Sequence, residues 1–271
     1  ACHYQQGQLE EAREVLVRSA AIYRRLADQA PDDRAIQDQL AYVLYWLGHT
    51  HAGLGDREQS LASFQGRVNI LQMLAELAPA DAHALSSLAD SLCDAGHTCL
   101  KDLEQPDEAL QWLTRAEATY RDHLRRFDPA SPSTRGDLAN ALDLLGVATA
   151  SLDRPDETLR YLSEALDIRR GLAAEAPDVL ESQLKLARDL IVLGGLHFQR
   201  DELDQAEAYF TSSSTTLRLL ADLEPGVHER MLIIALRGLA ETLTRLGKVE
   251  DADKATARAD TLEEEYPDPD D

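Results

Sequence analysis

Hydrophobic residues recur at every third or fourth position along most of the chain. Between residues 12 and 26, for example, Val15, Leu16, Ile22 and Leu26 fall on one side of a helix. Runs in which β-branched and polar residues alternate, the usual sign of strands, are absent. The pattern therefore predicts an all-α fold.

The predicted helices come in pairs, and each helix is about six turns long. The first helix of a pair is expected at residues 32–54, 81–102, 131–152, 178–200 and 227–246. The second helix is expected at residues 8–29, 57–77, 106–127, 155–175, 203–223 and 249–265.

Glycine and proline support these boundaries. Gly55 and Gly247 suit the tight turn between the two helices of a pair, and Pro106 and Pro155 suit a first helical position. Residues 1–6 resemble the last turn of an earlier helix that Gly7 ends. We therefore expect the chain to open in the middle of a repeat and to continue a longer protein.

A spaced set of small residues and prolines recurs with a period of about 48 residues. The first small residue of each set lies in the first helix, at Gly48, Gly96, Gly146, Gly194 and Ala240. Twelve or thirteen residues later comes the second, at Ser60, Ala109, Thr158, Ala206 and Ala252. A proline follows about nineteen residues further on, at Pro79, Pro129, Pro177 and Pro225, with Pro267 early. A fixed period of this length indicates stacked helical units.

These positions resemble the tetratricopeptide repeat, whose pattern is W-x2-L-G-x2-Y, then A-x3-F, then P. In the first full unit Leu44, Gly48 and His51 take the W, G and Y slots, and Ser60 with Phe64 takes the A-x3-F pair. The usual unit has 34 residues, so this longer period adds about two turns to each helix. The resemblance implies a right-handed superhelical solenoid of antiparallel helix pairs.

We predict one array of about five and a half repeats over residues 1–266, followed by an acidic, disordered tail at 267–271. The repeats are 1–30 (partial), 31–78, 79–128, 129–176, 177–224 and 225–266. Two histidines, His51 and His197, occupy the tyrosine slot of their units and are expected to be hydrogen-bonded core residues.

Charge and cysteine content narrow the function classes. The 49 acidic residues against 27 Lys and Arg give a net charge of −22, which argues against nucleic acids and anionic membranes as partners. Three cysteines without a CxxC pair favour a reducing, cytoplasmic location. No nucleophile elbow, phosphate loop or zinc-protease motif appears, so we expect neither catalysis nor a cofactor.

The resemblance implies that the first helices line a concave, peptide-binding groove. The residues expected to face it are Tyr42, Tyr45, His49, Asp90, His97, Lys101, Asn140, Asp143, Arg188, Arg237 and Arg245. Its three arginines could bind an acidic segment of a partner, or they could pair with acidic residues of this chain.

The predicted function is therefore a protein- or peptide-binding scaffold or sensor module, as the C-terminal part of a larger bacterial signalling protein. One alternative is a small-molecule or metal-sensing regulatory domain, with Cys93, His97 and His49 as candidate zinc ligands and no evident fourth ligand. Another is a self-assembly element that stacks through its end repeats, so the chain is expected to be a monomer or to self-associate weakly.

Overall fold

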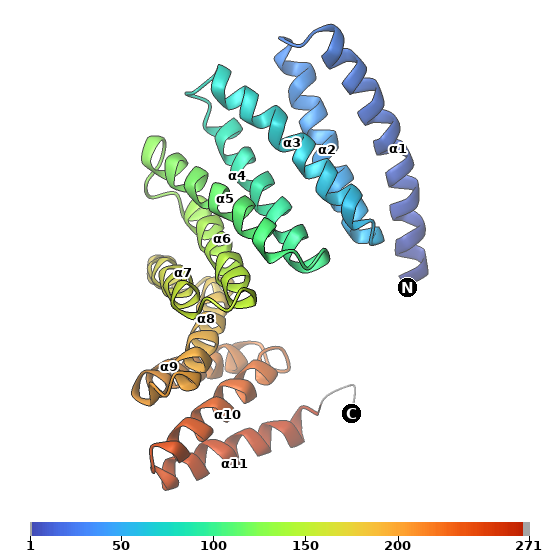
Figure 1. The fold of residues 1–271 in the computed structure, drawn as a ribbon. Helices are drawn as coiled ribbons and strands as arrows, with labels where there is room; N and C mark the ends of the chain where they lie inside the picture. The colour runs from blue at the N-terminus through green and yellow to red at the C-terminus, as the bar shows by residue number, and fades with distance from the viewer. Residues whose placement is uncertain (1, 268–271) are drawn as a thin grey trace. The chain divides into compact units, whose positions relative to one another are not determined.

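The structure is a computed structural model that describes residues 2–267, with side chains from Gly7 onward. The described residues form eleven α-helices and one short π-helix, and no strand occurs among them (Figure 1). The first helices of the pairs are α2 (Arg34–Leu54), α4 (Ala82–His97), α6 (Pro132–Ser151), α8 (Leu180–Gln199) and α10 (Glu229–Arg245). The second helices are α1 (Cys2–Gln29), α3 (Arg57–Leu77), α5 (Pro106–Arg126), α7 (Pro155–Glu175), α9 (Leu203–Leu223) and α11 (Val249–Glu265). The predicted all-α fold of paired helices is confirmed.

The predicted break at Gly7 is wrong, because α1 runs through this residue without interruption. A Cβ atom placed on Gly7 would meet nothing within 4 Å, so the glycine lies in open space. An interior glycine costs a helix about 1 kcal/mol. That cost is too small to end a long helix that packs along α2.

A π-helix, η1 (Thr98–Asp102), replaces the last turn that was predicted to be α-helical in the second full repeat. The Leu103 amide donates to the Thr98 carbonyl over 3.1 Å, a bond that spans five residues instead of four. In this repeat Ala109 comes thirteen positions after Gly96, whereas in the other repeats the second small residue comes twelve positions after the first. The wider turn takes up the extra residue.

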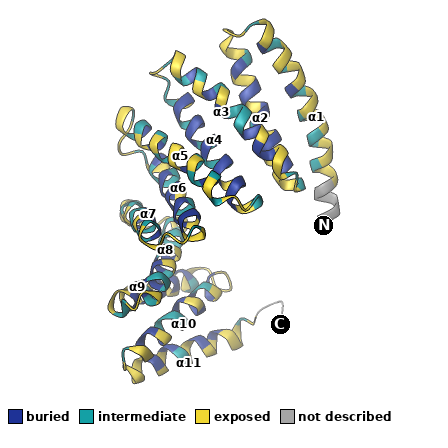
Figure 2. Cartoon of the chain, viewed as in Figure 1, coloured by how far each residue is buried: buried dark blue, intermediate teal, exposed yellow. Residues whose placement is uncertain are grey.

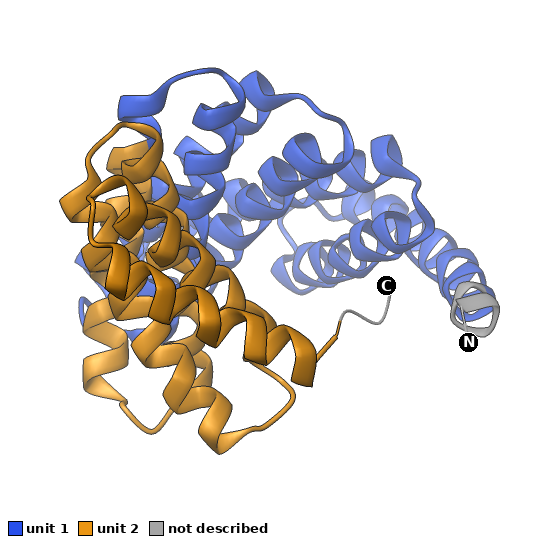
Figure 3. Ribbon diagram, turned by 90° about the horizontal axis from the view of Figure 1, so that it is seen from below, with its two compact units in different colours: residues 1–158 blue, residues 159–271 orange. Residues whose placement is uncertain are grey.

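The chain divides into two compact units, residues 1–158 and 159–271, and α7 contains the division (Figure 3). In unit 1, buried residues concentrate on α2 and α4, which have helices on both sides, while α1 is mostly exposed (Figure 2). One cluster joins α1 to α2 through Ala20, Ala27, Leu40 and Leu44. In unit 2 a separate cluster joins α8, α9, α10 and α11.

The first small residue marks a close approach of two helices in three of the sets, at Gly48, Gly96 and Gly194. A Cβ atom on Gly48 would lie 2.7 Å from Cε1 of Phe64, and one on Gly96 would lie 2.6 Å from Cγ of Leu113. These distances are far below van der Waals contact, so α2 and α4 can lie this close to α3 and α5 only without a side chain there.

The turn inside each pair uses one left-handed residue. Gly55 and Gly247 occupy it as predicted, with φ of 80° and 74°. The other three turns place Glu104, Asp153 and Asp201 in the same conformation, with φ between 54° and 62°. The same turn therefore recurs where the sequence has no glycine.

The two histidines in the tyrosine slot are buried and hydrogen-bonded, as predicted. His51 Nδ1 lies 3.2 Å from Oδ2 of Asp56, and His197 Nδ1 lies 2.5 Å from Oε2 of Glu202. Each acid begins the next helix of the pair, so the contact ties the turn to the core. The tail predicted at 267–271 lies outside the described residues apart from Pro267.

Candidate interaction site

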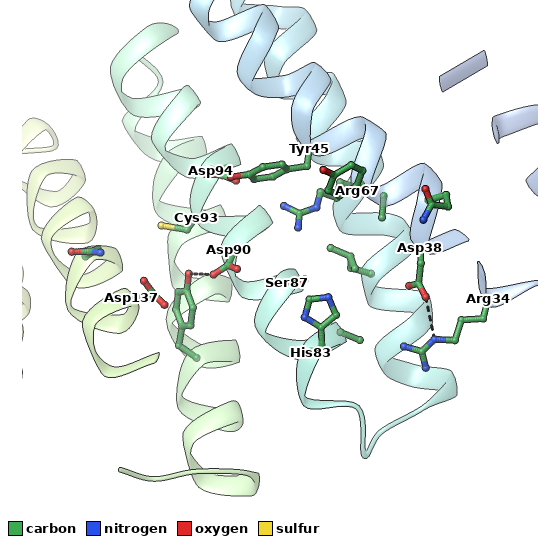
Figure 4. Close-up of a pocket in the computed structure, with 17 residues that line it drawn as sticks. Arg34, Asp38, Tyr45, Arg67, His83, Ser87, Asp90, Cys93, Asp94 and Asp137 are labelled. Carbon is green, nitrogen blue, oxygen red and sulfur yellow. Dashed lines mark hydrogen bonds and ion pairs between the residues drawn. The ribbon is translucent and has the colours of Figure 1, made fainter. Parts of the chain in front are cut away.

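A cavity of about 760 Å³ opens in unit 1, bordered by three successive first helices (Figure 4). Its charged and polar lining side chains come from five helices. Those from the first helices are Arg34, Asp38, Gln39, Tyr42 and Tyr45 on α2, His83, Ser87, Asp90, Cys93 and Asp94 on α4, and Asp137 and Asn140 on α6. Between these helices, α3 contributes Arg67 and α5 contributes Tyr120.

Four of the predicted groove residues, Tyr42, Tyr45, Asp90 and Asn140, line this cavity together. His49 lies at its edge, where its ring centroid is 4.5 Å from that of Tyr45. The register of the first helices therefore brings these side chains to one place, as the repeat predicts.

Three other predicted groove residues of unit 1 do not line the cavity. His97 and Lys101 are exposed, and Asp143 is half-buried. Lys101 was placed by α-helical spacing, but it lies in η1, where the wider turn changes the direction of each side chain.

In unit 2, two of the three predicted arginines are engaged by this chain itself. Arg237 lies 2.7 Å from Asp260 and 2.5 Å from Glu263, and Arg245 lies 2.5 Å from Asp201. The third, Arg188, is exposed. Self-pairing was one of the two interpretations that the sequence left open.

Sequence reasoning missed several cavity residues, among them Asp94, Asp137 and Arg67, and Arg67 is the one with a visible signal in the sequence. It lies seven residues after Ser60, and the residues at the same place in the other repeats are all small and fully buried: Ala116, Ala165, Ser213 and Ala259. An arginine in a slot that is otherwise reserved for small side chains was a visible signal. The predicted groove residues all lie on first helices, whereas Arg67 lies on a second helix, α3.

The Arg67 guanidinium is stacked on Tyr45, with its central carbon 4.6 Å from the ring centroid. Its Nε and Nη1 atoms are buried and have no hydrogen-bond acceptor among the described residues. A buried donor without an acceptor costs roughly 1–3 kcal/mol. Ring stacking on Tyr45 therefore positions the side chain, and its Nε and Nη1 donors are available to a ligand acceptor.

Burial dominates the electrostatics of the cavity. It raises the pKa of Asp94 to about 7, although the Arg67 charge opposes the shift. It also raises the pKa of Asp90, which accepts a 2.8 Å hydrogen bond from the Tyr120 hydroxyl. Burial lowers the pKa of Arg67, against the attraction of both carboxylates.

The candidate zinc ligands are not assembled into a metal site. Among the described residues no group of three or more His, Cys, Asp and Glu side chains could hold a metal ion. Burial raises the pKa of the Cys93 thiol to about 12, which disfavours the thiolate that a metal binds. His49 turns instead toward Asp94, with its Nε2 atom 3.7 Å from Oδ2.

Within residues 2–267, no helix combines the length and the apolar character that crossing a bilayer requires. The expected cytoplasmic location stays a prediction.

Paired helices, close crossings at small residues and a regular period define this chain as a helical-repeat protein. The model of the tetratricopeptide repeat family matches residues 3–33. Together with the fold, this match confirms the resemblance that the spacing predicts.

Solved structures share the fold at low sequence identity. BtubC (BKLC) from P. vanneervenii is 17% identical, with a TM-score of 0.68 over 96% of this chain and 94% of its own. The apo form of RapI is 9% identical, with a TM-score of 0.65 over 98% of this chain and 66% of its own. Aspartyl phosphate phosphatase F from Bacillus subtilis is 11% identical, with a TM-score of 0.51 over 93% and 72%. Among curated proteins, none matches the sequence.

Proposed function

We propose that this chain is a protein-interaction scaffold that binds a peptide segment of a partner across α2, α4 and α6 of unit 1. The observation that carries the proposal is the cavity, because its lining comes from matching faces of three successive first helices. An extended segment lying across these helices would contact each of them in turn.

Exposed aromatic residues beside the cavity support this assignment. Tyr42 is 59% exposed and Trp46 is 46% exposed. Their rings lie edge to face with centroids 6.3 Å apart, and Tyr45 lies 5.2 Å from Trp46. Tyrosine and tryptophan are enriched among the residues that dominate protein interfaces, since they bury much surface at little entropic cost.

The proposal has two finer parts. The first is a role within a larger bacterial signalling protein, because units elongated to about 48 residues resemble arrays common in such proteins. Recognition of an acidic segment in unit 2 would rest on Arg188, because Arg237 and Arg245 would first have to leave the acids they contact.

Selection from a displayed library of random peptides would test the function. We expect peptides that bind the immobilised chain, and we expect Tyr45→Ala to weaken them at least tenfold in a titration by fluorescence anisotropy. A matched control is Trp112→Ala, which removes a half-buried aromatic residue of α5 outside the cavity lining.

Binding that Trp112→Ala weakens as much as Tyr45→Ala does would contradict a site on the first helices. A library that yields no binder would contradict the scaffold function itself.

A further inference from the structure

We propose that the unit 1 cavity accepts a basic side chain, arginine or lysine, of the bound segment. Its cationic head would lie between Asp90 and Asp94, while main-chain carbonyl groups of the segment accept hydrogen bonds from Arg67. The inference rests on the proposed function and names the chemistry that the cavity recognises.

The charges that line the cavity favour a cation. Four carboxylates face two guanidinium groups, and one of those, Arg34, is already held by Asp38 at 3.3 Å and by Asp81. With Arg34 engaged in this way, Asp90 and Asp94 outnumber Arg67 in the lining. Figure 4 shows Arg67 and Asp90 pointing into the same space between α2 and α4.

Neither central carboxylate forms an ion pair with a Lys or Arg side chain among the described residues, although the Arg67 charge acts on both. Asp90 has a neutral donor, the Tyr120 hydroxyl. Asp94 lies 3.7 Å from Nε2 of His49, and burial keeps the pKa of His49 below its ordinary value. A ligand ammonium or guanidinium group would supply a positive charge beside Asp90 and Asp94.

The donors of Arg67 indicate which hydrogen-bond acceptors a ligand must bring together with its cationic group. Its spare donors require acceptors, but a ligand carboxylate would face repulsion from Asp90 and Asp94. Main-chain carbonyl oxygens accept hydrogen bonds without adding negative charge. A peptide that carries one basic residue brings both groups, spaced by its own side chain.

Four peptides would test the preference: acetyl-Ala-Ala-X-Ala-Ala-amide with arginine, lysine, citrulline or glutamate at X. Citrulline matches the shape of arginine without its charge. By isothermal titration at pH 8 and low salt, we expect the arginine and lysine peptides to bind at least about tenfold tighter than the other two. Equal affinity for the arginine and citrulline peptides, or a preference for glutamate, would overturn the inference.

Two variants separate the proposed contacts. Asp90→Asn keeps an oxygen that can accept from the Tyr120 hydroxyl, so we expect it to remove most of the arginine preference. Arg67→Ala installs the residue found at this slot in three other repeats, and we expect all four peptides to weaken by a similar factor. Glu58→Gln, an exposed change in α3 outside the lining, removes one charge and should leave every affinity unchanged.

Circular dichroism melts would establish that each variant is folded. An unchanged ratio of arginine to citrulline affinity in folded Asp90→Asn would contradict the inference. Binding of free arginine as tight as that of the arginine peptide would also overturn it, because the cavity would then be a small-molecule site. Library peptides that require Tyr45 but show no enrichment in basic residues would leave the scaffold function standing and remove only this inference.

Discussion

Asp94 shows how burial of one side chain affects stability. Its pKa in the folded chain is raised to about 7 from an ordinary 3.8. Well below pH 3.8 it is protonated in both states. As pH rises through 3.8 toward 7 the unfolded chain releases the proton first, so the folded state loses stability across this window and does not regain it above.

We predict that Asp94→Asn has the same stability as the parent chain at about pH 3 and greater stability at about pH 8. A shift of this size corresponds to about 4 kcal/mol. The side chain keeps 27% of its surface exposed, so we expect on the order of 2 kcal/mol after allowing for solvent screening. Urea unfolding at both values would measure the difference, and Glu58→Gln is the exposed control. Parallel pH profiles for the variant and the parent chain would contradict the prediction.

Gly48 illustrates a steric limit at the residue scale. We predict that Gly48→Ala destabilises the chain by about 1–3 kcal/mol, because the new methyl group would overlap the Phe64 ring. Gly7→Ala, whose methyl group would meet nothing, should be neutral or stabilising by up to about 1 kcal/mol. Denaturant midpoints would compare them.

The fifth repeat carries a natural compensation for a larger residue at this slot. Ala240 stands where the others have glycine, and Thr256 stands where Phe64 and Phe210 are found. We therefore expect Phe64→Leu to recover part of the stability lost by Gly48→Ala. A double variant less stable than the sum of the two single changes would argue against direct contact.

At the scale of a helix pair, the turns without glycine store backbone strain. Glu104 has φ of 54°, a conformation that costs a residue with a side chain roughly 1–2 kcal/mol. Glycine lowers this cost but loses more entropy on folding. We predict that Glu104→Gly stabilises the chain by about 0.5–1 kcal/mol.

The reciprocal change is Gly55→Ala at φ of 80°, which should destabilise by about 1 kcal/mol. Thermal unfolding followed by circular dichroism would measure both. A loss of stability in Glu104→Gly would mean that the carboxylate contributes more than the backbone strain costs.

A buried ion pair joins α7 to α8 within unit 2. Arg169 is 5% exposed, and its Nη1 atom lies 2.5 Å from Oδ2 of Asp189. We predict that Asp189→Ala destabilises the chain by about 3–5 kcal/mol, because it leaves a buried guanidinium without this carboxylate.

In the next repeat the corresponding slots hold Leu217 and Ala235. Arg169→Leu combined with Asp189→Ala should therefore recover most of the loss. A double variant as unstable as Asp189→Ala would show that packing, and not the unpaired charge, causes the defect.

At the scale of the whole molecule, helices contact mainly their neighbours in the sequence. Stability in such arrays is approximately a sum over repeats and their interfaces. We predict that Asp189→Ala accelerates amide hydrogen exchange in α7, α8 and α9 and leaves exchange in α1 to α3 unchanged. Uniform acceleration along the chain, measured by mass spectrometry, would indicate a single cooperative unit instead.

Most of the fold could be predicted from the sequence, because the same spacing of small residues and prolines marks the helix boundaries in each repeat. The cavity could be predicted only in part. Helical register predicts that Tyr42, Tyr45 and Asp90 lie together, and they line one cavity because α2 and α4 follow that register. Lys101 lies outside the lining, in η1, because one extra residue changes the local helix type. Arg67 is not predicted because it lies on a second helix, and Asp94 is not predicted although it lies on a first helix.

The π-helix at Thr98–Asp102 has a consequence for how such arrays tolerate insertions. A surplus residue is accommodated as a local widening of one coil, and the following turn and α5 still begin as they do in the other repeats. The helix pairs that follow therefore keep the same spacing of helices and turns. Insertions of one residue can therefore accumulate within the helices of such a protein. A sequence alignment that allows gaps only in loops would place these insertions wrongly.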